Sequence, residues 1–190
     1  EMLRFTQAVS SQKKPTVFDE DNTASMYRDT IGWTIHRKRA WTSLLSGAHY
    51  DYIDFSITVG SEQGTVSSRK ELRTWFQHLS EFISSFDYVH AAVTSAWLRQ
   101  TPADVTVSGL AVAGKDYVAY LADNREVTDA TAGQQIPCTG RLDLPPGRYL
   151  VTLYSPVTGE SSPALTMEGN AELSLPSFVQ DIVVRARRIE

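Results

Sequence analysis

The spacing of hydrophobic and polar positions changes twice in the first third of the chain. A short apolar run at 16–18 ends abruptly in four polar residues, D-E-D-N, and hydrophobic residues at helical spacing follow at 31–45. From 48 to 57, aromatic, acidic and apolar residues then alternate with a period of two. The pattern predicts a strand, an acidic loop, a helix ended by Ser46-Gly47 and a second strand, which is the repeating unit of an α/β barrel.

Two further helices are predicted on either side of this unit. Residues 1–9 have the helical spacing of a helix end, and Ser68-x-x-Glu71 has the form of a capping box. The helix that follows it carries an apolar stripe, which we expect to be core: Leu72, Trp75, Phe76, Leu79, Phe82, Ile83 and Phe86. The short basic run at 36–39, in contrast, is typical of a solvated helix face.

The pattern changes again after about residue 104. Seven short apolar or alternating segments, separated by turns such as P-P-G, T-G-E and G-N, occupy 105–187. Regular short strands of this kind predict an antiparallel β-sandwich of about 90 residues. We therefore expect two domains, 1–96 with α/β character and 97–190 as the sandwich.

Composition narrows the classes of function. The 190 residues are 42% hydrophobic and 21% charged, and no apolar run is long enough to cross a membrane. The formal charge of −4 offers no basic face to a polyanion, so neither nucleic acid nor a membrane is an expected partner. The single cysteine and four histidines lack metal-ligand spacing, and no metal or cofactor is expected. Oligomeric state and location, cytoplasmic or secreted, are left open.

The acidic loop is the first candidate site. Asp19, Glu20, Asp21 and Asn22 follow the first strand directly, and in an α/β barrel the C-terminal tips of the strands form the active-site mouth. The same four residues also suit a loop that caps the following helix, because acids favour a helix N-terminus and Asn22 can bond its free amides. A calcium loop of the EF-hand type is disfavoured, since the required glycine is absent after Thr23.

Several motifs together resemble a known enzyme family. These are K-P-T-V-F-D-E-D-N-T-A-S at 14–25, R-K-R-A-W-T-S-L-L-S-G-A at 37–48 and H-Y-D-Y-I-D-F at 49–55. They resemble the last two β/α units of glycoside hydrolases of the cellulase-like (β/α)8 superfamily. The segments G-K-D-Y-V-A-Y-L, P-P-G-R-Y-L-V-T-L-Y-S-P-V-T-G and L-P-S-F-V-Q-D-I-V-V-R are similar to the sandwich that follows such barrels, of which a related form is described as collagen-binding. The implied fold is a partial (β/α)8 (TIM) barrel followed by an antiparallel β-sandwich.

This resemblance implies a carbohydrate substrate and roles for particular residues. Glu20 would be the nucleophile of a two-carboxylate, retaining mechanism, although many relatives have one glutamate where this chain has Asp19-Glu20-Asp21, which leaves the register open by one residue. The proton donor, which the family takes from its fourth strand, would lie upstream of residue 1, so we expect this chain alone to be inactive. Substrate-binding candidates are Asp19, Asp21, Asn22, His49, Tyr52 and Asp54.

Alternation divides the second strand into two faces. His49, Asp51, Ile53 and Phe55 share one, and Tyr50, Tyr52, Asp54 and Ser56 share the other. Tyrosines and carboxylates suit a sugar-binding floor, and they equally suit barrel packing with supporting hydrogen bonds. We expect the face of Tyr52 and Asp54 to point inward.

An alternative function is that of a noncatalytic module in which the sandwich binds glycan or a matrix protein. Such a module needs an exposed row of aromatic rings, and the candidates are Tyr117, Tyr120, Tyr149 and Tyr154. Alternation places Tyr149 and Tyr154 on opposite faces, which favours a packing role. A serine or cysteine nucleophile has little support, because no G-x-S-x-G occurs and Cys138 is expected in a turn region of the sandwich.

Overall fold

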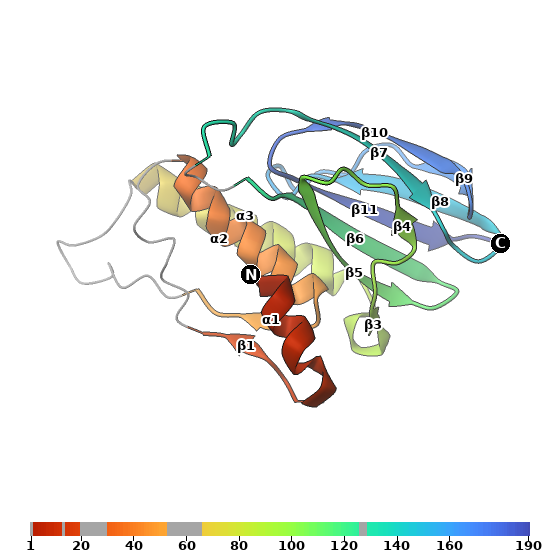
Figure 1. Ribbon diagram of the computed structural model, residues 1–190, viewed down its shortest axis with the longest axis horizontal. Helices are drawn as coiled ribbons and strands as arrows, with labels where there is room; N and C mark the ends of the chain where they lie inside the picture. Colours follow the sequence, from red (N-terminus) through yellow and green to blue (C-terminus); the bar gives the residue numbers. More distant parts are fainter. Residues whose placement is uncertain (1, 13, 20–29, 53–65, 126–128) are drawn as a thin grey trace.

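The computed structural model describes residues 2–12, 14–19, 30–52, 66–125 and 129–190. Its N-terminal half contains α1 (Met2–Val9), η1 (Ser10–Gln12), β1 (Val17–Phe18), α2 (Thr30–Leu45), β2 (His49–Tyr50), α3 (Val66–Ser84) and η4 (Tyr88–His90). The remaining strands are β3 (Ala92–Val93), β4 (Leu98–Arg99), β5 (Val105–Val112), β6 (Asp116–Asp123), β7 (Ile136–Leu142), β8 (Arg148–Tyr154), β9 (Leu165–Glu168), β10 (Glu172–Phe178) and β11 (Asp181–Arg188). The result is a mixed α/β fold with several sheets (Figure 1).

The predicted strand–helix–strand unit is present as β1, α2 and β2. The two strands pair in parallel, with Val17 opposite His49 and Phe18 opposite Tyr50. The backbone N–H of Asp51 donates to the carbonyl of Phe18 at 2.9 Å and extends the pairing by one residue. Gly47, at φ 80°, ends the connection from α2 in the left-handed conformation that glycine adopts at little cost. These two strands are the only parallel pair within the described residues, which form no closed barrel.

The C-terminal half consists of two antiparallel sheets. One has six strands in the order β3-β5-β6-β11-β8-β9, and the other has three in the order β10-β7-β4. Seven strands lie between 105 and 188, as expected, but β7 covers 136–142 where the pattern indicated a strand at 141–144, and the two-residue strands β3 and β4 were not foreseen. Cys138 lies within β7, opposite Leu175, so its expected place in a turn region is wrong.

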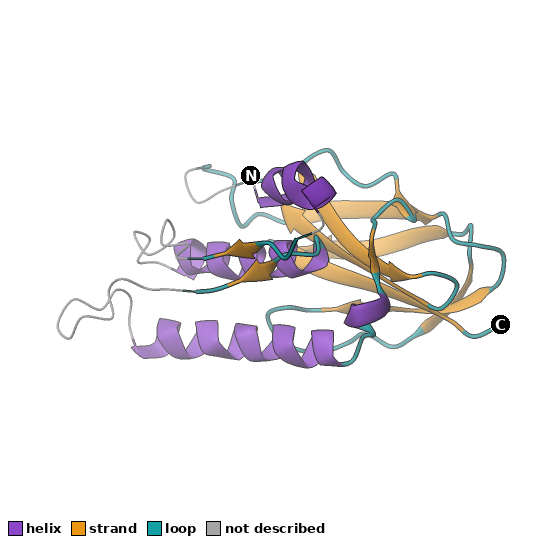
Figure 2. Ribbon diagram, turned by 90° about the horizontal axis from the view of Figure 1, so that it is seen from below, coloured by secondary structure: helices purple, strands orange, loops and turns teal. Residues whose placement is uncertain are grey.

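Each face of the six-stranded sheet is buried against a different partner. One face packs on the three-stranded sheet, in a core that includes Leu121, Tyr149 and Val184 on one side and Leu142, Leu173 and Phe178 on the other. The opposite face packs on α2 and α3, through a second core of Trp41, Leu45, Phe82, Tyr120, Tyr154 and Val183. The two helices therefore lie between the β1–β2 pair and this sheet (Figures 1 and 2). Burial on both faces explains why β6 is apolar along nearly its whole length.

Among the helices, the expected apolar stripe of α3 is confirmed. Leu72, Trp75, Leu79 and Phe82 are buried, Phe76 and Ile83 are half-buried, and the buried Phe86 lies just beyond the end of the helix. The helix begins at Val66, so Ser68 lies inside it, and the predicted capping-box position is wrong. In the described part of the chain, no helix has the length and apolar character needed to cross a bilayer.

The basic run on α2 departs most from expectation. His36 and Arg37 are 0% and 2% exposed, and Lys38 and Arg39 are half-buried. The prediction of a solvated face is therefore wrong. The reason is that α2 is enclosed by β2 and α3 on one side and by the sandwich on the other, so little of the helix surface reaches water.

A contact between α3 and the loop after β8 leads to a first prediction. Gly159 has φ 74°, and a Cβ at this position would lie 2.6 Å from Cδ2 of His78, whose Nδ1 is 3.1 Å from the carbonyl of Pro156. We expect Gly159→Ala to lower the free energy of unfolding by about 2 to 4 kcal/mol, which combines the left-handed backbone cost of about 1 to 2 kcal/mol with the clash. Urea unfolding followed by circular dichroism measures the change.

Gly114→Ala is the matched control. Gly114 has the same φ of 74°, but a Cβ there meets nothing within 4 Å. The control should show only the backbone cost, about 1 to 2 kcal/mol. Equal losses in the two variants would contradict a steric role for the His78 contact.

Candidate active site

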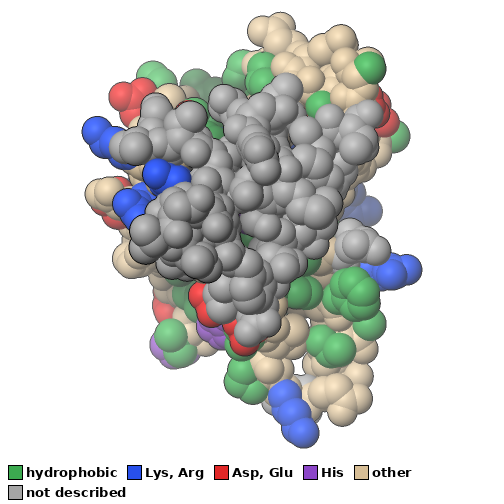
Figure 3. Space-filling model, turned by 90° about the vertical axis from the view of Figure 1, so that its left-hand side faces the viewer, with side chains coloured by type: hydrophobic (Ala, Val, Ile, Leu, Met, Phe, Trp, Pro, Cys, Tyr) green, Lys and Arg blue, Asp and Glu red, His purple; other side chains and the backbone are tan. Residues whose placement is uncertain are grey.

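Of the candidate site residues that the structure describes, Asp19 and Tyr52 follow the C-terminal ends of β1 and β2, and His49 begins β2. Asp19 directly follows β1 and is exposed, and His49 is the first residue of β2 and is also exposed. Acidic and histidine side chains are visible together at one margin of this end of the molecule (Figure 3). Glu20, Asp21, Asn22 and Asp54 lie outside the described residues, and their roles stay predictions.

Tyr52 lies on the helix side of the strand pair. Its ring meets His36 of α2 edge-on, with centroids 4.5 Å apart, and Phe76 of α3 at 5.7 Å. Tyr50 points the same way, with its ring 6.3 Å from Phe76 and its hydroxyl 3.3 Å from Nδ1 of His36. In a barrel the inward direction is away from the helices, so the expected inward direction of this face is wrong at Tyr52. A role for Tyr52 in substrate binding stays a prediction.

Arg37 forms a buried polar network that the sequence analysis missed. Its Nε and Nη2 each donate a hydrogen bond of 2.8 Å to a different carboxylate oxygen of Asp181, at the start of β11. The hydroxyl of Tyr120 on β6 donates to the same carboxylate, also at 2.8 Å. The guanidinium lies 4.3 Å from the ring centroid of Trp75 on α3, in cation–π geometry. One side chain of α2 thus contacts α3 and β11, and through Asp181 it is linked to Tyr120 on β6.

Electrostatics keeps Arg37 and Tyr120 in fixed protonation states. Burial alone would lower the pKa of Arg37, but the charge and hydrogen bonds of Asp181 outweigh it, and the pKa is raised above its ordinary value. Burial, together with the negative charge of Asp181, raises the pKa of Tyr120 well above its ordinary value. Arg37 therefore stays charged and Tyr120 stays a hydrogen-bond donor. Fixed protonation states suit a structural role better than proton transfer.

An unusual backbone turn places the Asp181 carboxylate. Gln180 has φ 69°, in the left-handed region that residues other than glycine seldom adopt. Across it the N–H of Asp181 donates to the carbonyl of Val179 at 2.8 Å, and the carbonyl of Gln180 accepts the N–H of Asp123 at 2.7 Å. The turn holds the start of β11 against β6, where Asp181 can reach Arg37.

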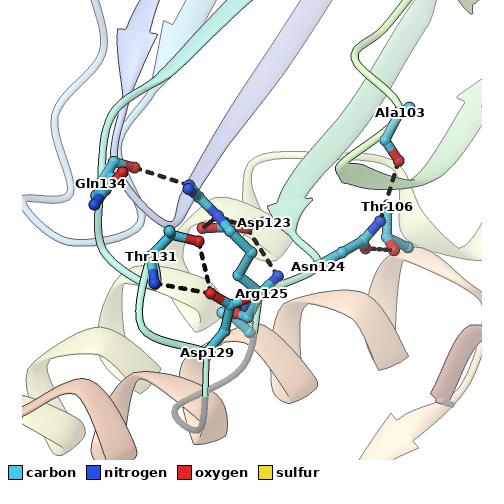
Figure 4. Close-up of polar contacts among 9 residues, drawn as sticks. Ala103, Thr106, Asp123, Asn124, Arg125, Asp129, Thr131 and Gln134 are labelled. Atoms are coloured by element: carbon cyan, nitrogen blue, oxygen red, sulfur yellow. Dashed lines mark hydrogen bonds and ion pairs between the residues drawn. The ribbon is translucent and has the colours of Figure 1, made fainter.

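A second polar cluster lies in the described parts of the connection between β6 and β7 (Figure 4). The Nε of Arg125 bonds Asp123 at 2.8 and 3.0 Å, and its Nη2 donates to the carbonyl of Gln134 at 2.9 Å. The N–H and hydroxyl of Thr131 donate to one oxygen of Asp129, and these bonds lower the pKa of that carboxyl. The charged groups of this cluster are thus bonded to neighbouring protein groups, which indicates a structural role. Among the described residues, no group of three or more His, Cys, Asp or Glu side chains could hold a metal ion.

Comparison with known proteins gives a likeness in fold. No protein-family model and no curated protein matches the sequence. A crystal structure described as a glycoside hydrolase family 5 protein from Bacteroides vulgatus is similar with a TM-score of 0.70 at 13% identity, over 98% of this chain and 44% of that one. A structure described as a glycoside hydrolase is similar with a TM-score of 0.69 at 12% identity, over 98% of this chain and 45% of its own. The chain therefore shares the fold of part of these two structures and spans less than half the length of either.

Proposed function

We propose that this chain forms the last two β/α units of a glycoside hydrolase barrel together with its trailing sandwich. The observation that carries the proposal is the parallel β1–α2–β2 unit, whose first strand ends in the exposed Asp19 directly before Glu20. Two solved structures of the same partial fold are described as glycoside hydrolases, which supports this choice of chemistry. The substrate would be an oligo- or polysaccharide.

The proposed reaction is retaining hydrolysis of an O-glycosidic bond. Glu20 would attack the anomeric carbon, and a second carboxyl group about 5 to 5.5 Å away would protonate the leaving oxygen and then activate water. That second group would come from barrel strands that precede residue 1 in a longer protein, called the full-length protein below. Asp19, Asp21, Asn22, His49, Tyr52 and Asp54 remain the proposed substrate-binding residues.

The alternative, a glycan- or matrix-binding sandwich, loses its candidate platform. Tyr117, Tyr120, Tyr149 and Tyr154 are at most 7% exposed. Tyr149 lies in the core between the two sheets and Tyr154 in the core against the helices, so the two rings do point to opposite faces. No observation on the described residues favours this second function.

Hydrolysis assays on two proteins test the proposal. We expect the full-length protein to release 4-nitrophenol from at least one of a set of aryl glycosides, and the 190-residue chain to release none. The reason is that two parallel strands cannot enclose a substrate or supply the second carboxyl group. Turnover by the 190-residue chain, or no turnover by the full-length protein on any aryl glycoside or polysaccharide tested, would contradict the proposal.

A further inference from the structure

The direction of the side chains on β1 and β2 is set by the aromatic residues that face the helices. Phe18, Tyr50 and Tyr52 are each half-buried, and Tyr50 and Tyr52 contact Phe76 of α3. Because side chains alternate along a strand, their immediate neighbours must point to the opposite face. The structure thus distinguishes the two faces, which the sequence pattern alone does not.

The opposite face carries Val17, Asp19, His49 and Asp51, and all four side chains are exposed. Val17 and His49 are partners in the strand register, and the bond from the N–H of Asp51 to the carbonyl of Phe18 continues that register to Asp19 and Asp51. Neighbouring strands lie about 4.8 Å apart, so the two aspartates lie side by side at the tips of the strands.

The character of this face changes along the strands. Val17, at the start of β1, is apolar and 54% exposed, whereas both tips end in a carboxylate. Parallel strands are normally covered on both faces, and barrel strands change from core to site residues toward their C-terminal ends. An apolar base and an acidic tip on the side away from the helices is the pattern expected of strands that line a cleft.

We propose that Asp51 binds a hydroxyl group of the carbohydrate at the tip of β2, beside Asp19. The inference rests on the proposed function and adds a substrate-contacting residue to it. An ionised carboxylate is a strong acceptor for sugar hydroxyls. Two neighbouring carboxylates also disfavour a negatively charged ring, so the substrate class is a neutral sugar and not a uronic acid.

The test compares Asp51→Asn with wild type in the full-length protein. Loss of a hydrogen bond to a charged group is worth about 1.5 to 3 kcal/mol, so kcat/KM for a neutral aryl glycoside should fall about 10- to 100-fold, mainly through KM. The ratio of kcat/KM for an aryl glucoside to kcat/KM for the matching glucuronide should also fall. In the 190-residue chain, where Asp51 is exposed, the same substitution should leave the free energy of unfolding unchanged. Asp104→Asn, at an exposed aspartate of the sandwich, is the matched control and should match wild type.

The outcomes separate this inference from the proposed function. If the wild-type protein hydrolyses glycosides and Asp51→Asn has the same KM and kcat, Asp51 does not bind substrate, while the hydrolase assignment stands. A wild-type preference for the glucuronide would overturn the neutral-sugar assignment. If the full-length wild-type protein hydrolyses nothing, both the proposed function and the role of Asp51 fail.

Discussion

Replacing Asp181 with asparagine is expected to lower the free energy of unfolding by about 3 to 5 kcal/mol, since it leaves a buried guanidinium without its counter-charge. The side chains of Arg37 and Asp181 are 2% and 0% exposed, so water cannot solvate the cation in the variant. Tyr120 would also lose a carboxylate acceptor. Urea unfolding measures the loss, and tryptophan fluorescence is a suitable signal because Trp75 lies against Arg37.

A double-mutant cycle separates the interaction energy of the ion pair from the cost of leaving one buried partner without its counter-charge. Arg37→Met and Asp181→Asn should each destabilise strongly, whereas the double variant should cost less than their sum by about 1 to 3 kcal/mol. The surface pair Arg99–Asp143, with side chains 63% and 51% exposed, provides the control. Asp143→Asn should change stability by less than about 1 kcal/mol. If Asp181→Asn cost no more than this control, the network would not contribute to holding α2 against the sandwich.

This network also marks where prediction from the sequence stopped. Arg37 precedes Trp41 by four residues and Leu45 by eight, so the three side chains share one face of α2. The basic residues beside Arg37 nevertheless suggested a solvated face. Nothing in the local sequence indicates that Arg37 has a buried acidic partner. That partner, Asp181, is 144 residues away in the sequence. Local periodicity cannot detect a pairing between residues so far apart in the sequence.

The parts that could be predicted are those with a long regular pattern. The stripe of α3 and most of the seven strands from 105 to 187 repeat their periodicity over enough residues to identify them. β3 and β4, at two residues each, have no period to detect. For residues 49–52, alternation separated the two faces of the second strand correctly, but only the contacts of Tyr50 and Tyr52 with Phe76 distinguish the helix side from the open side.

The largest effect on activity is expected at Glu20. In the full-length protein, Glu20→Gln should lower kcat by at least about 10³-fold, because an amide cannot form the glycosyl–enzyme bond of a retaining mechanism. Steady-state hydrolysis of an aryl glycoside measures the loss. In Glu20→Ala, added azide should restore turnover, since a small anion can enter the vacated space and attack the anomeric carbon. The product should be a glycosyl azide of inverted configuration, which identifies Glu20 as the nucleophile and not the proton donor.

The neighbouring acids provide matched controls, because each substitution removes one negative charge from the same short segment. Asp19→Asn and Asp21→Asn should lower kcat/KM by about 10- to 100-fold, as expected for lost bonds to substrate, and azide should not rescue either. If Asp19→Asn or Asp21→Asn abolished activity while Glu20→Gln retained it, the nucleophile would be one residue away from Glu20. The exposed Asp19 would then be the stronger candidate, because its carboxylate lies on the same side of the strand pair as His49.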